Sequence, residues 1–399
     1  MNFRSLSKVV LISLVTLSAF GQSPGATGPA PTQKPKSVNW PSLGFIPAGG
    51  RYNPEETLIS PETAKTLVLL AKYNSGSTID SSSAVVSNDA YFGMEAGDFF
   101  AISNTKELWK YTTTGAVFSS PAVFGNTVYF GSENGRFYAL NRTTGAPAWS
   151  AYPNGFPTGS IIDSSPVVSH GNVYFGSYDS YFYALNAATG DLLWKYQTGS
   201  LILGSPCVAN GVVYFGSYDG NLYALNATTG APLSWSPLSF GTGNIGYGQP
   251  AVANGILYFG TTQPENSGTV YAYNAASGSF VWSTSSSTGV GPVETAPAIA
   301  EGNVYVAGSS GKVYCFNAGT GAEIWSTDVG AGKSSPAIAN GVLFVGGEGG
   351  SIYALNAKTG AKLWSYRTSE NPIFASPAVV NGKVYINAND GYAYVFHLK

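Results

Sequence analysis

The chain has 399 residues, of which only 10% are charged, and its formal net charge is −2. This balance offers no basic surface for nucleic acid, so we expect no nucleic-acid partner. The 50 glycines, 26 tyrosines and 21 phenylalanines are typical of an all-β protein with many turns.

Residues 1–21 are typical of a secretory signal peptide. Arg4 and Lys8 give a positive start, an apolar run follows from Val9 to Phe20, and small residues precede Gln22. The run is too short to span a bilayer, and no cysteine lies near the cleavage point to carry a lipid. We expect an exported protein, periplasmic or extracellular, that does not span the membrane; a retained membrane anchor is the alternative.

Two further segments precede the regular part of the chain. Residues 22–38 are rich in Pro, Gly, Thr and Gln and are expected to form a flexible linker. Residues 39–65 are interrupted by Asn53-Pro54 and Ser60-Pro61, and we expect an irregular clasp across one face of the domain that follows.

One stretch, Ser205 to Trp235, predicts a four-stranded meander. Pro206 to Ala209 is a short apolar run, and Asn210-Gly211 favours a two-residue hairpin turn. Val212 to Ser217 and Asn221 to Asn226 then alternate as the next two strands, and Trp235 enters the fourth. Such a unit cannot bury its faces alone and must stack on copies of itself.

The copies are present at spacings of 39 to 47 residues, which is the range of propeller blades. A proline marks the first strand at Pro121, Pro166, Pro206, Pro250, Pro297, Pro336 and Pro377, and Ser83 stands in its place in the first blade. A tryptophan marks the fourth strand at Trp109, Trp149, Trp194, Trp235, Trp282, Trp325 and Trp364. We expect each indole to pack between neighbouring blades as a structural docking residue, and a Thr-Gly turn precedes most of them.

Eight first strands but seven tryptophan strands leave one blade incomplete. The last unit stops after its third strand at Lys399, whereas Thr66 to Asn74 has the register of a fourth strand with Ala71 at the tryptophan position. We therefore predict that residues 66–399 form an eight-bladed β-propeller of four-stranded antiparallel blades, closed when this N-terminal strand pairs with the C-terminal blade.

The motif Ala187-Ala188-Thr189-Gly190-Asp191-Leu192-Leu193-Trp194 resembles the tryptophan-docking repeat of the pyrroloquinoline-quinone (PQQ) propeller superfamily. The segment with Trp40, Arg51-Tyr52-Asn53-Pro54 and Leu67 to Leu70 is similar to the opening of quinoprotein dehydrogenases. The resemblance implies either a PQQ-dependent oxidoreductase or a BamB-like scaffold without chemistry. The dehydrogenases carry an adjacent cysteine pair, calcium ligands and long loops, and this sequence has no adjacent cysteine pair and short loops.

The two cysteines are not expected to form a disulfide. Cys207 and Cys315 replace alanines in different strands of non-adjacent blades, too far apart for a bridge. We expect both to be small buried side chains.

The position three residues before each marker proline breaks the repeat and is the candidate site. It holds acids, aromatics, a leucine and one cation, namely Asp80, Phe118, Asp163, Leu203, Tyr247, Glu294, Lys333 and Phe374. We expect these residues to form a ring near one mouth of the central channel. They could be solvated loop ends, a ligand or peptide pocket, or a cation site that uses Asp80, Asp163 or Glu294.

No catalytic acid, base, nucleophile or metal cluster is assembled in this pattern. The function that we expect is a non-catalytic binding or scaffolding module, a monomeric toroid with a protein or cell-envelope partner and no cofactor. The alternatives are a quinoprotein dehydrogenase with PQQ and calcium, and a cell-surface carbohydrate-binding protein.

Overall fold

The first two strands of each repeat form an antiparallel hairpin at the inner end of a blade. Asn210 and Gly211 have φ values of 50° and 76°, so both residues adopt the left-handed conformation that a two-residue hairpin turn needs. The strands on either side pair through Cys207 with Tyr214 and Ala209 with Val212. The computed structural model describes residues 39–399 except 105, 242–244, 246, 263–267 and 285–287; the predicted signal peptide and linker lie outside the described residues.

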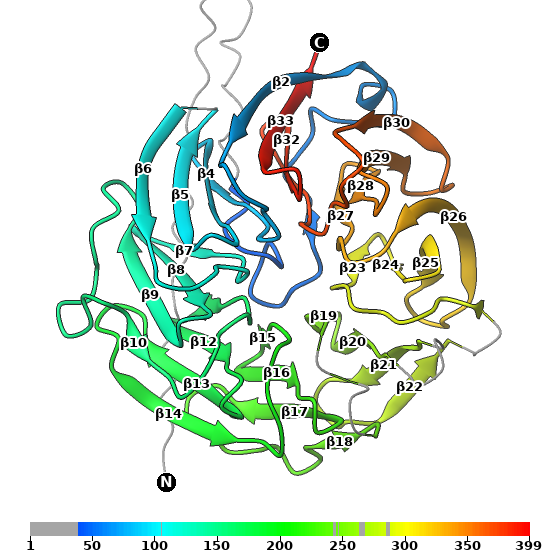
Figure 1. Ribbon diagram of the computed structural model, residues 1–399. Coiled ribbons are helices and arrows are strands. Elements are labelled where there is room, and N and C mark those ends of the chain that lie inside the picture. Colours follow the sequence, from blue (N-terminus) through cyan, green and yellow to red (C-terminus); the bar gives the residue numbers. More distant parts are fainter. Residues whose placement is uncertain (1–38, 105, 242–244, 246, 263–267, 285–287) are drawn as a thin grey trace, which may run out of the picture. The chain divides into compact units, whose positions relative to one another are not determined.

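In the described residues the strands form eight sheets around a central axis, which confirms the predicted eight-bladed propeller (Figure 1). The innermost strands are β3 (Ala84–Val86), β7 (Ala122–Phe124), β11 (Val167–Ser169), β15 (Cys207–Ala209), β19 (Ala251–Ala253), β23 (Ala298–Ala300), β27 (Ala337–Ala339) and β31 (Ala378–Val380). We number the blades 1 to 8 in the chain order of these strands.

The second and third strands of each blade are antiparallel to their neighbours. The second strands are β4 (Asp89–Gly93), β8 (Thr127–Ser132), β12 (Asn172–Gly176), β16 (Val212–Gly216), β20 (Ile256–Gly260), β24 (Asn303–Ala307), β28 (Val342–Gly346) and β32 (Lys383–Ala388). The third strands are β5 (Asp98–Ser103), β9 (Arg136–Asn141), β13 (Tyr181–Asn186), β17 (Asn221–Asn226), β21 (Val270–Asn274), β25 (Gly311–Asn317), β29 (Ser351–Asn356) and β33 (Tyr392–Leu398). Both faces of these strands are largely buried because blades pack against each other on both sides.

The outer strands are β6 (Lys106–Thr112), β10 (Phe156–Pro157), β14 (Leu192–Gln197), β18 (Leu238–Ser239), β22 (Phe280–Ser283), β26 (Glu323–Ala331), β30 (Lys362–Arg367) and β2 (Leu67–Asn74). The remaining elements described are β1 (Tyr52–Asn53) and the short 3-10 helix η1 (Ala64–Thr66).

The ring closes as predicted, because β2 pairs antiparallel with β33 and supplies the outer strand of blade 8 (Figure 1). Ala71 pairs with Val395, as Trp194 pairs with Ala184 in blade 3. Ala71 therefore occupies the tryptophan position of this blade.

The prediction that every tryptophan lies on a fourth strand is wrong for two blades. Trp149 and Trp235 precede the two-residue outer strands β10 and β18. Prolines interrupt both segments, at Pro147 and Pro153 in blade 2 and at Pro232 and Pro237 in blade 4, and a proline cannot donate a ladder hydrogen bond.

All seven indoles at the predicted docking positions nevertheless bond to the following blade. In the described residues each Nε1–H donates to a backbone carbonyl there at 2.8 to 3.1 Å; the acceptors, in the order of the seven tryptophans, are Arg142, Ala187, Ala227, Ala276, Ala318, Ala357 and Leu67. The Thr-Gly glycine lies under the indole of the preceding blade. A Cβ on Gly190, for example, would come within 2.6 Å of the Trp149 ring.

A ring of serines joins the blades near the axis. The backbone N–H of Ser120 donates to Ser165 Oγ at 2.9 Å, and that of Ser165 donates to Ser205 Oγ at 2.9 Å. The same contact recurs from Ser82, Ala296, Ser335 and Ser376 to the following blade. These bonds satisfy buried backbone groups where the blades converge.

The clasp (residues 39–65) runs across the other edge of the innermost strands. Its backbone accepts hydrogen bonds from the middle residue of these strands in blades 1, 2, 4, 5, 6 and 7, namely Val85, Val123, Val208, Val252, Ile299 and Ile338. Asn53 continues the contact to blade 8, because its Nδ2 donates to the Val379 carbonyl at 2.9 Å.

Candidate functional site: the channel-mouth pocket

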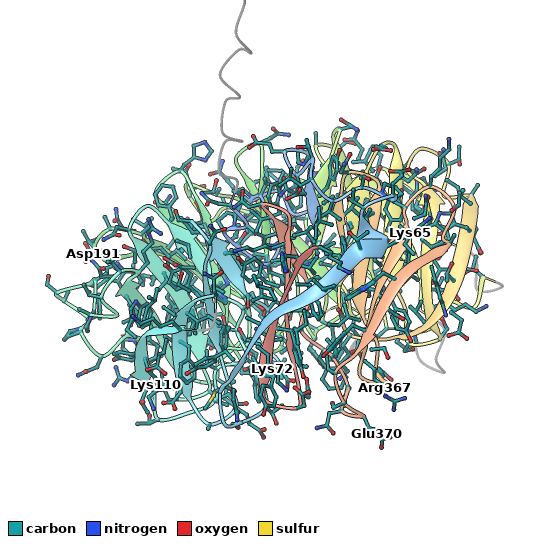
Figure 2. All side chains as sticks on the ribbon, turned by 90° about the horizontal axis from the view of Figure 1, so that it is seen from above. Lys65, Lys72, Lys110, Asp191, Arg367 and Glu370 are labelled. Atoms are coloured by element: carbon teal, nitrogen blue, oxygen red, sulfur yellow. The ribbon has the colours of Figure 1, made fainter. Side chains whose placement is uncertain are left out.

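The structure brings all eight candidate residues together. They line, with Ser205, one pocket of about 360 Å³. We call this the channel-mouth pocket, because every blade contributes one residue and the pocket therefore lies on the axis of the ring. Figure 2 shows the ring from the side, with Arg367 at the end of β30 and Glu370 of the following loop near its lower rim.

For Asp163, Leu203 and Phe374, the preceding residue explains why the candidate faces the axis. Ile162, which precedes Asp163, is fully buried and lies on Gly131 at the end of β8, where an added Cβ would be 2.2 Å from Ile162 Cγ2. The same arrangement places Ile202 on Gly176 and Ile373 on Gly346. Because neighbouring side chains of an extended segment point to opposite sides, the next residue turns toward the channel.

Asp163 is the most perturbed carboxylate of the pocket. Burial raises its pKa to about 6, the hydrogen bond from Tyr178 opposes the rise, and the charge of Glu133 adds to it. Tyr178 Oη donates to Asp163 Oδ2 at 2.8 Å, while Oδ1 is buried and has no hydrogen-bond partner. The pocket therefore contains a carboxylate that is only half satisfied.

Asp80 is in a similar state in blade 1. Burial raises its pKa, a hydrogen bond from Asn389 lowers it, the charge of Glu95 raises it and that of Lys333 lowers it. Its Oδ1 atom is also buried without a partner.

Glu294 and Lys333, from adjacent blades, form an ion pair with 3.7 Å between Oε2 and Nζ. The side chain of Lys333 is 55% exposed, so this pair contributes little to stability. The ammonium also lies 5.3 Å from the centroid of the Phe374 ring, within range of a cation–π contact.

Sequence reasoning missed a second set of residues beside the pocket. Tyr178 and Tyr218 follow the second strands of blades 3 and 4 within the repeated Gly-Ser-Tyr-Asp turns. Tyr178 bonds to Asp163, and the Tyr218 ring lies 5.1 Å from that of Tyr247. The sequence contains a signal for these residues, because this turn position also varies between repeats and holds Glu95 in blade 1.

The positions of the acidic side chains bear on the predicted cation alternative. Among the residues that the structure describes, no group of three or more His, Cys, Asp or Glu could hold a metal ion. Asp80, Asp163 and Glu294 come from blades 1, 3 and 6, so the predicted cation alternative lacks the converging oxygens that a hard cation requires. Cys207 and Cys315 are free and buried, and burial raises the pKa of both thiols, that of Cys315 to about 12.

Within the described part of the chain, no helix has the length and apolar character needed to cross a membrane. The regular structure there consists of strands and one three-residue 3-10 helix.

Solved structures with the same fold include BamB and two dehydrogenases. BamB from Moraxella catarrhalis is 19% identical, with 84% of this chain and 98% of that chain covered and a TM-score of 0.69. Quinohemoprotein alcohol dehydrogenase from Comamonas testosteroni is 16% identical, with coverages of 90% and 80% and a TM-score of 0.76. A europium-containing methanol dehydrogenase is 13% identical, with coverages of 90% and 98% and a TM-score of 0.74. At these identities the likeness shows the fold alone.

A comparison with curated protein sequences found no match. The family model described as outer membrane protein assembly factor BamB matches residues 65–284 and 266–399, which together span all eight blades. The chain therefore belongs to this BamB-like family of the PQQ-like propeller superfamily, as its tryptophan-docking repeat predicts.

Proposed function

We propose that the protein is an exported, non-catalytic binding module that holds a protein partner at the channel-mouth pocket. The observation that carries this proposal is the convergence of the eight repeat-breaking side chains on one pocket, in a ring whose blades are otherwise nearly uniform. A ring of repeated blades whose side chains differ from blade to blade at one channel opening suits recognition. The family description, an assembly factor, supports a protein as the partner.

The charges of the pocket favour binding over quinone chemistry. PQQ is a tricarboxylate, and in the related dehydrogenases it is accompanied by calcium and an adjacent cysteine pair. Here Asp80, Asp163 and Glu294 face a single lysine that is already paired, and the two cysteines are apart in blades 4 and 6. These residues do not fit an anionic cofactor with a divalent cation.

A capture experiment tests the proposal. The wild-type protein and the triple variant Asp163→Ala/Glu294→Ala/Lys333→Ala are used as baits with cell-envelope extract. Asp191→Ala serves as the control, because Asp191 is exposed in a turn of the outer part of blade 3. We expect the triple variant to lose a partner that the wild type and the control retain; equal capture by all three baits would contradict the proposal.

A thermal melt with and without PQQ plus calcium distinguishes the proposed binding function from the alternative, a quinoprotein dehydrogenase. A ligand that binds only the folded protein at a hundredfold excess over its Kd adds about 2.7 kcal/mol to the unfolding free energy. We expect no shift. A clear shift, with quinone absorbance retained after desalting, would favour a dehydrogenase.

A further inference from the structure

The channel-mouth pocket contains two three-residue arcs of similar composition. The first arc consists of Glu294, Lys333 and Phe374 in blades 6 to 8, and the second consists of Asp80, Phe118 and Asp163 in blades 1 to 3. Each arc contains at least one carboxylate and one phenylalanine. Only the first arc contains a cation.

The first arc shows how this pocket accommodates an ammonium group. Lys333 Nζ lies 3.7 Å from the Glu294 carboxylate and 5.3 Å from the centre of the Phe374 ring. Carboxylate and ring face both favour the positive charge, and the aliphatic stem of the lysine can lie along apolar surface. The pocket therefore already contains one example of a lysine bound by an acid and a phenylalanine.

The second arc has the same groups in place without a cation. Its two carboxylates come from the blades on either side of Phe118, and each retains an oxygen that has no hydrogen-bond partner. The charges of Glu95 and Lys333 both act on Asp80, with opposite signs, and Glu133 adds negative charge near Asp163. Acidic groups that burial has stripped of water are stabilised most by a positive ligand that enters the same low-dielectric space.

The remaining wall of the pocket suits the stem of a long side chain. Leu203 and Tyr247 occupy blades 4 and 5, between the two arcs, and contribute apolar surface. The cavity of about 360 Å³ falls in the range of pockets that bind small ligands.

We propose that the arc of Asp80, Phe118 and Asp163 binds the ammonium or guanidinium of a lysine or arginine side chain presented by a protein partner. This inference rests on the proposed binding function and names the chemistry of the group that is bound. The side chain enters along the axis, its cation lies over Phe118 between the two carboxylates, and its stem contacts Leu203 and Tyr247.

Matched tripeptides test this assignment on the full chain by calorimetric titration at low ionic strength. The probes are acetyl-Gly-X-Gly-amide with X as lysine, arginine, norleucine or glutamate. We expect the lysine and arginine peptides to bind at least tenfold more tightly than the norleucine peptide, which has a similar stem without charge, and the glutamate peptide not to bind. Equal binding of the lysine and norleucine peptides, or no binding of the basic peptides, would overturn the proposal.

Two variants localise the binding. The double variant Asp80→Asn/Asp163→Asn keeps the shape of the arc and should lower the affinity for the lysine peptide at least tenfold. Asp191→Asn is the control and should leave this affinity unchanged. Lys333→Met removes the cation that contacts Glu294 and Phe374, and it should raise the affinity for the lysine peptide at least threefold. Melting curves confirm that each variant is folded, and unchanged affinity in a folded Asp80→Asn/Asp163→Asn protein would refute the proposed arc.

The capture experiment distinguishes failure of this inference from failure of the proposed function. Loss of the partner in the triple variant but not in Asp80→Asn/Asp163→Asn would mean that the pocket binds the partner without using a basic side chain. Retention of the partner by both variants would contradict the proposed function itself.

Discussion

The interface between blades 8 and 1 is built differently from the other seven. Within the described residues, a docked tryptophan joins each of the seven other pairs of neighbouring blades, and its Nε1–H bonds to the next blade. At the eighth interface, the seam, Ala71 stands at the tryptophan position. Blade 1 also lacks the Thr-Gly turn on which an indole would lie. At six interfaces the tryptophan of one blade and the glycine of the next are two halves of one contact. Trp364 bonds to Leu67 of blade 8, which has no Thr-Gly turn, and the seam lacks both halves.

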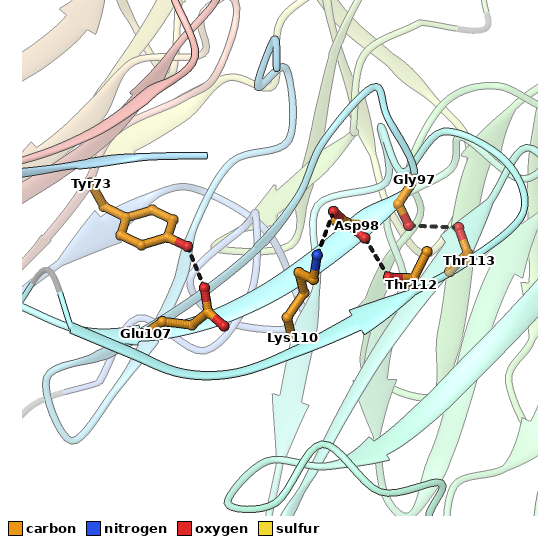
Figure 3. Close-up of polar contacts among 7 residues, drawn as sticks. All are labelled: Tyr73, Gly97, Asp98, Glu107, Lys110, Thr112 and Thr113. Carbon is orange, nitrogen blue, oxygen red and sulfur yellow. Dashed lines mark hydrogen bonds and ion pairs between the residues drawn. The ribbon is translucent and has the colours of Figure 1, made fainter. Parts of the chain in front are cut away.

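Aromatic and polar side-chain contacts join blades 8 and 1 at the seam instead. Tyr73 of β2, which is held in blade 8 by the pairing of β2 with β33, packs its ring 5.5 Å from that of Phe100 in blade 1. Figure 3 shows the Tyr73 hydroxyl, which donates to Glu107 Oε2 at 2.6 Å. Lys383 of blade 8 also donates to Asn104 of blade 1 at 3.0 Å. The main chain is continuous across the seam, because β2 of blade 8 leads into β3 of blade 1; the two ends of the propeller meet inside blade 8, where β2 pairs with β33.

The largest effect is expected from Trp149→Ala. Trp149 is only 1% exposed and bonds to Ala187 of the next blade, so its removal leaves a cavity and removes one of the two hydrogen bonds to the Ala187 carbonyl, which Tyr129 Oη also donates to. The free energy of unfolding should fall by about 3 to 5 kcal/mol in a denaturant titration. Leu193→Ala, at a residue that is 45% exposed, is the control and should change it by less than about 0.5 kcal/mol. A loss below about 1 kcal/mol for Trp149→Ala would contradict the docking role.

Gly190→Ala tests the second half of the contact. Gly190 has a φ of +81°, and an added Cβ would be 2.6 Å from the Trp149 ring, whereas Gly171 has a φ of +77° with open space around it. We expect a loss of about 2 to 4 kcal/mol for Gly190→Ala and about 1 kcal/mol for Gly171→Ala. The difference measures the indole contact apart from the backbone strain. Equal losses would show that glycine serves the turn alone.

The sequence predicted the ring, its closure and the position of Ala71, because repeat spacing and hairpin turns are local signals. It also identified the eight residues of the channel-mouth pocket, since one position varied where its neighbours did not. The role of Gly190 was only half predicted: the turn explains its φ, but the contact with Trp149 comes from the preceding blade. The repeat pattern did not predict the interrupted outer strands of blades 2 and 4, because the prolines in these segments override the strand pattern that the other blades follow.

The contacts of the clasp could not be predicted, because they join residues that are far apart in the sequence. Arg51 is fully buried, and within the described residues no carboxylate pairs with it. It donates instead to the carbonyls of Leu43, Pro336 and Pro377 and lies over the Trp40 ring. Burial lowers its pKa from 12.5 to about 9. A basic residue before Tyr-Asn-Pro gives no local signal of such a role.

Arg51→Met tests how far the clasp supports the blades beside the seam. Arg51 bonds to the carbonyls of Pro336 at 2.9 Å and Pro377 at 2.6 Å, which belong to blades 7 and 8. The variant leaves buried carbonyls unpaired, but it also removes the cost of burying a charge. We expect a net loss of about 2 kcal/mol in the unfolding free energy. Arg367→Met, at an exposed arginine, is the control, and no loss in Arg51→Met would show that the clasp does not stabilise this side of the ring.

The smallest effect is expected from Tyr73→Phe, which removes the hydrogen bond to Glu107 and keeps the ring contacts of the seam. The bond is solvent-exposed, so the loss in unfolding free energy should be about 1 kcal/mol or less at pH 7. Burial first, and then the bond to Glu107, raise the pKa of Tyr73. The unfolded tyrosine ionises near pH 10, so the contribution of Tyr73 is fully present below that pH and declines as the pH rises toward the folded value. The difference between wild type and Tyr73→Phe should therefore be constant from pH 7 to 9 and narrow above about pH 10, measured by denaturant titration at each pH. A difference that stays constant above pH 10 would contradict the raised pKa of Tyr73, and no difference at pH 7 would mean that the hydroxyl bond contributes nothing to the seam.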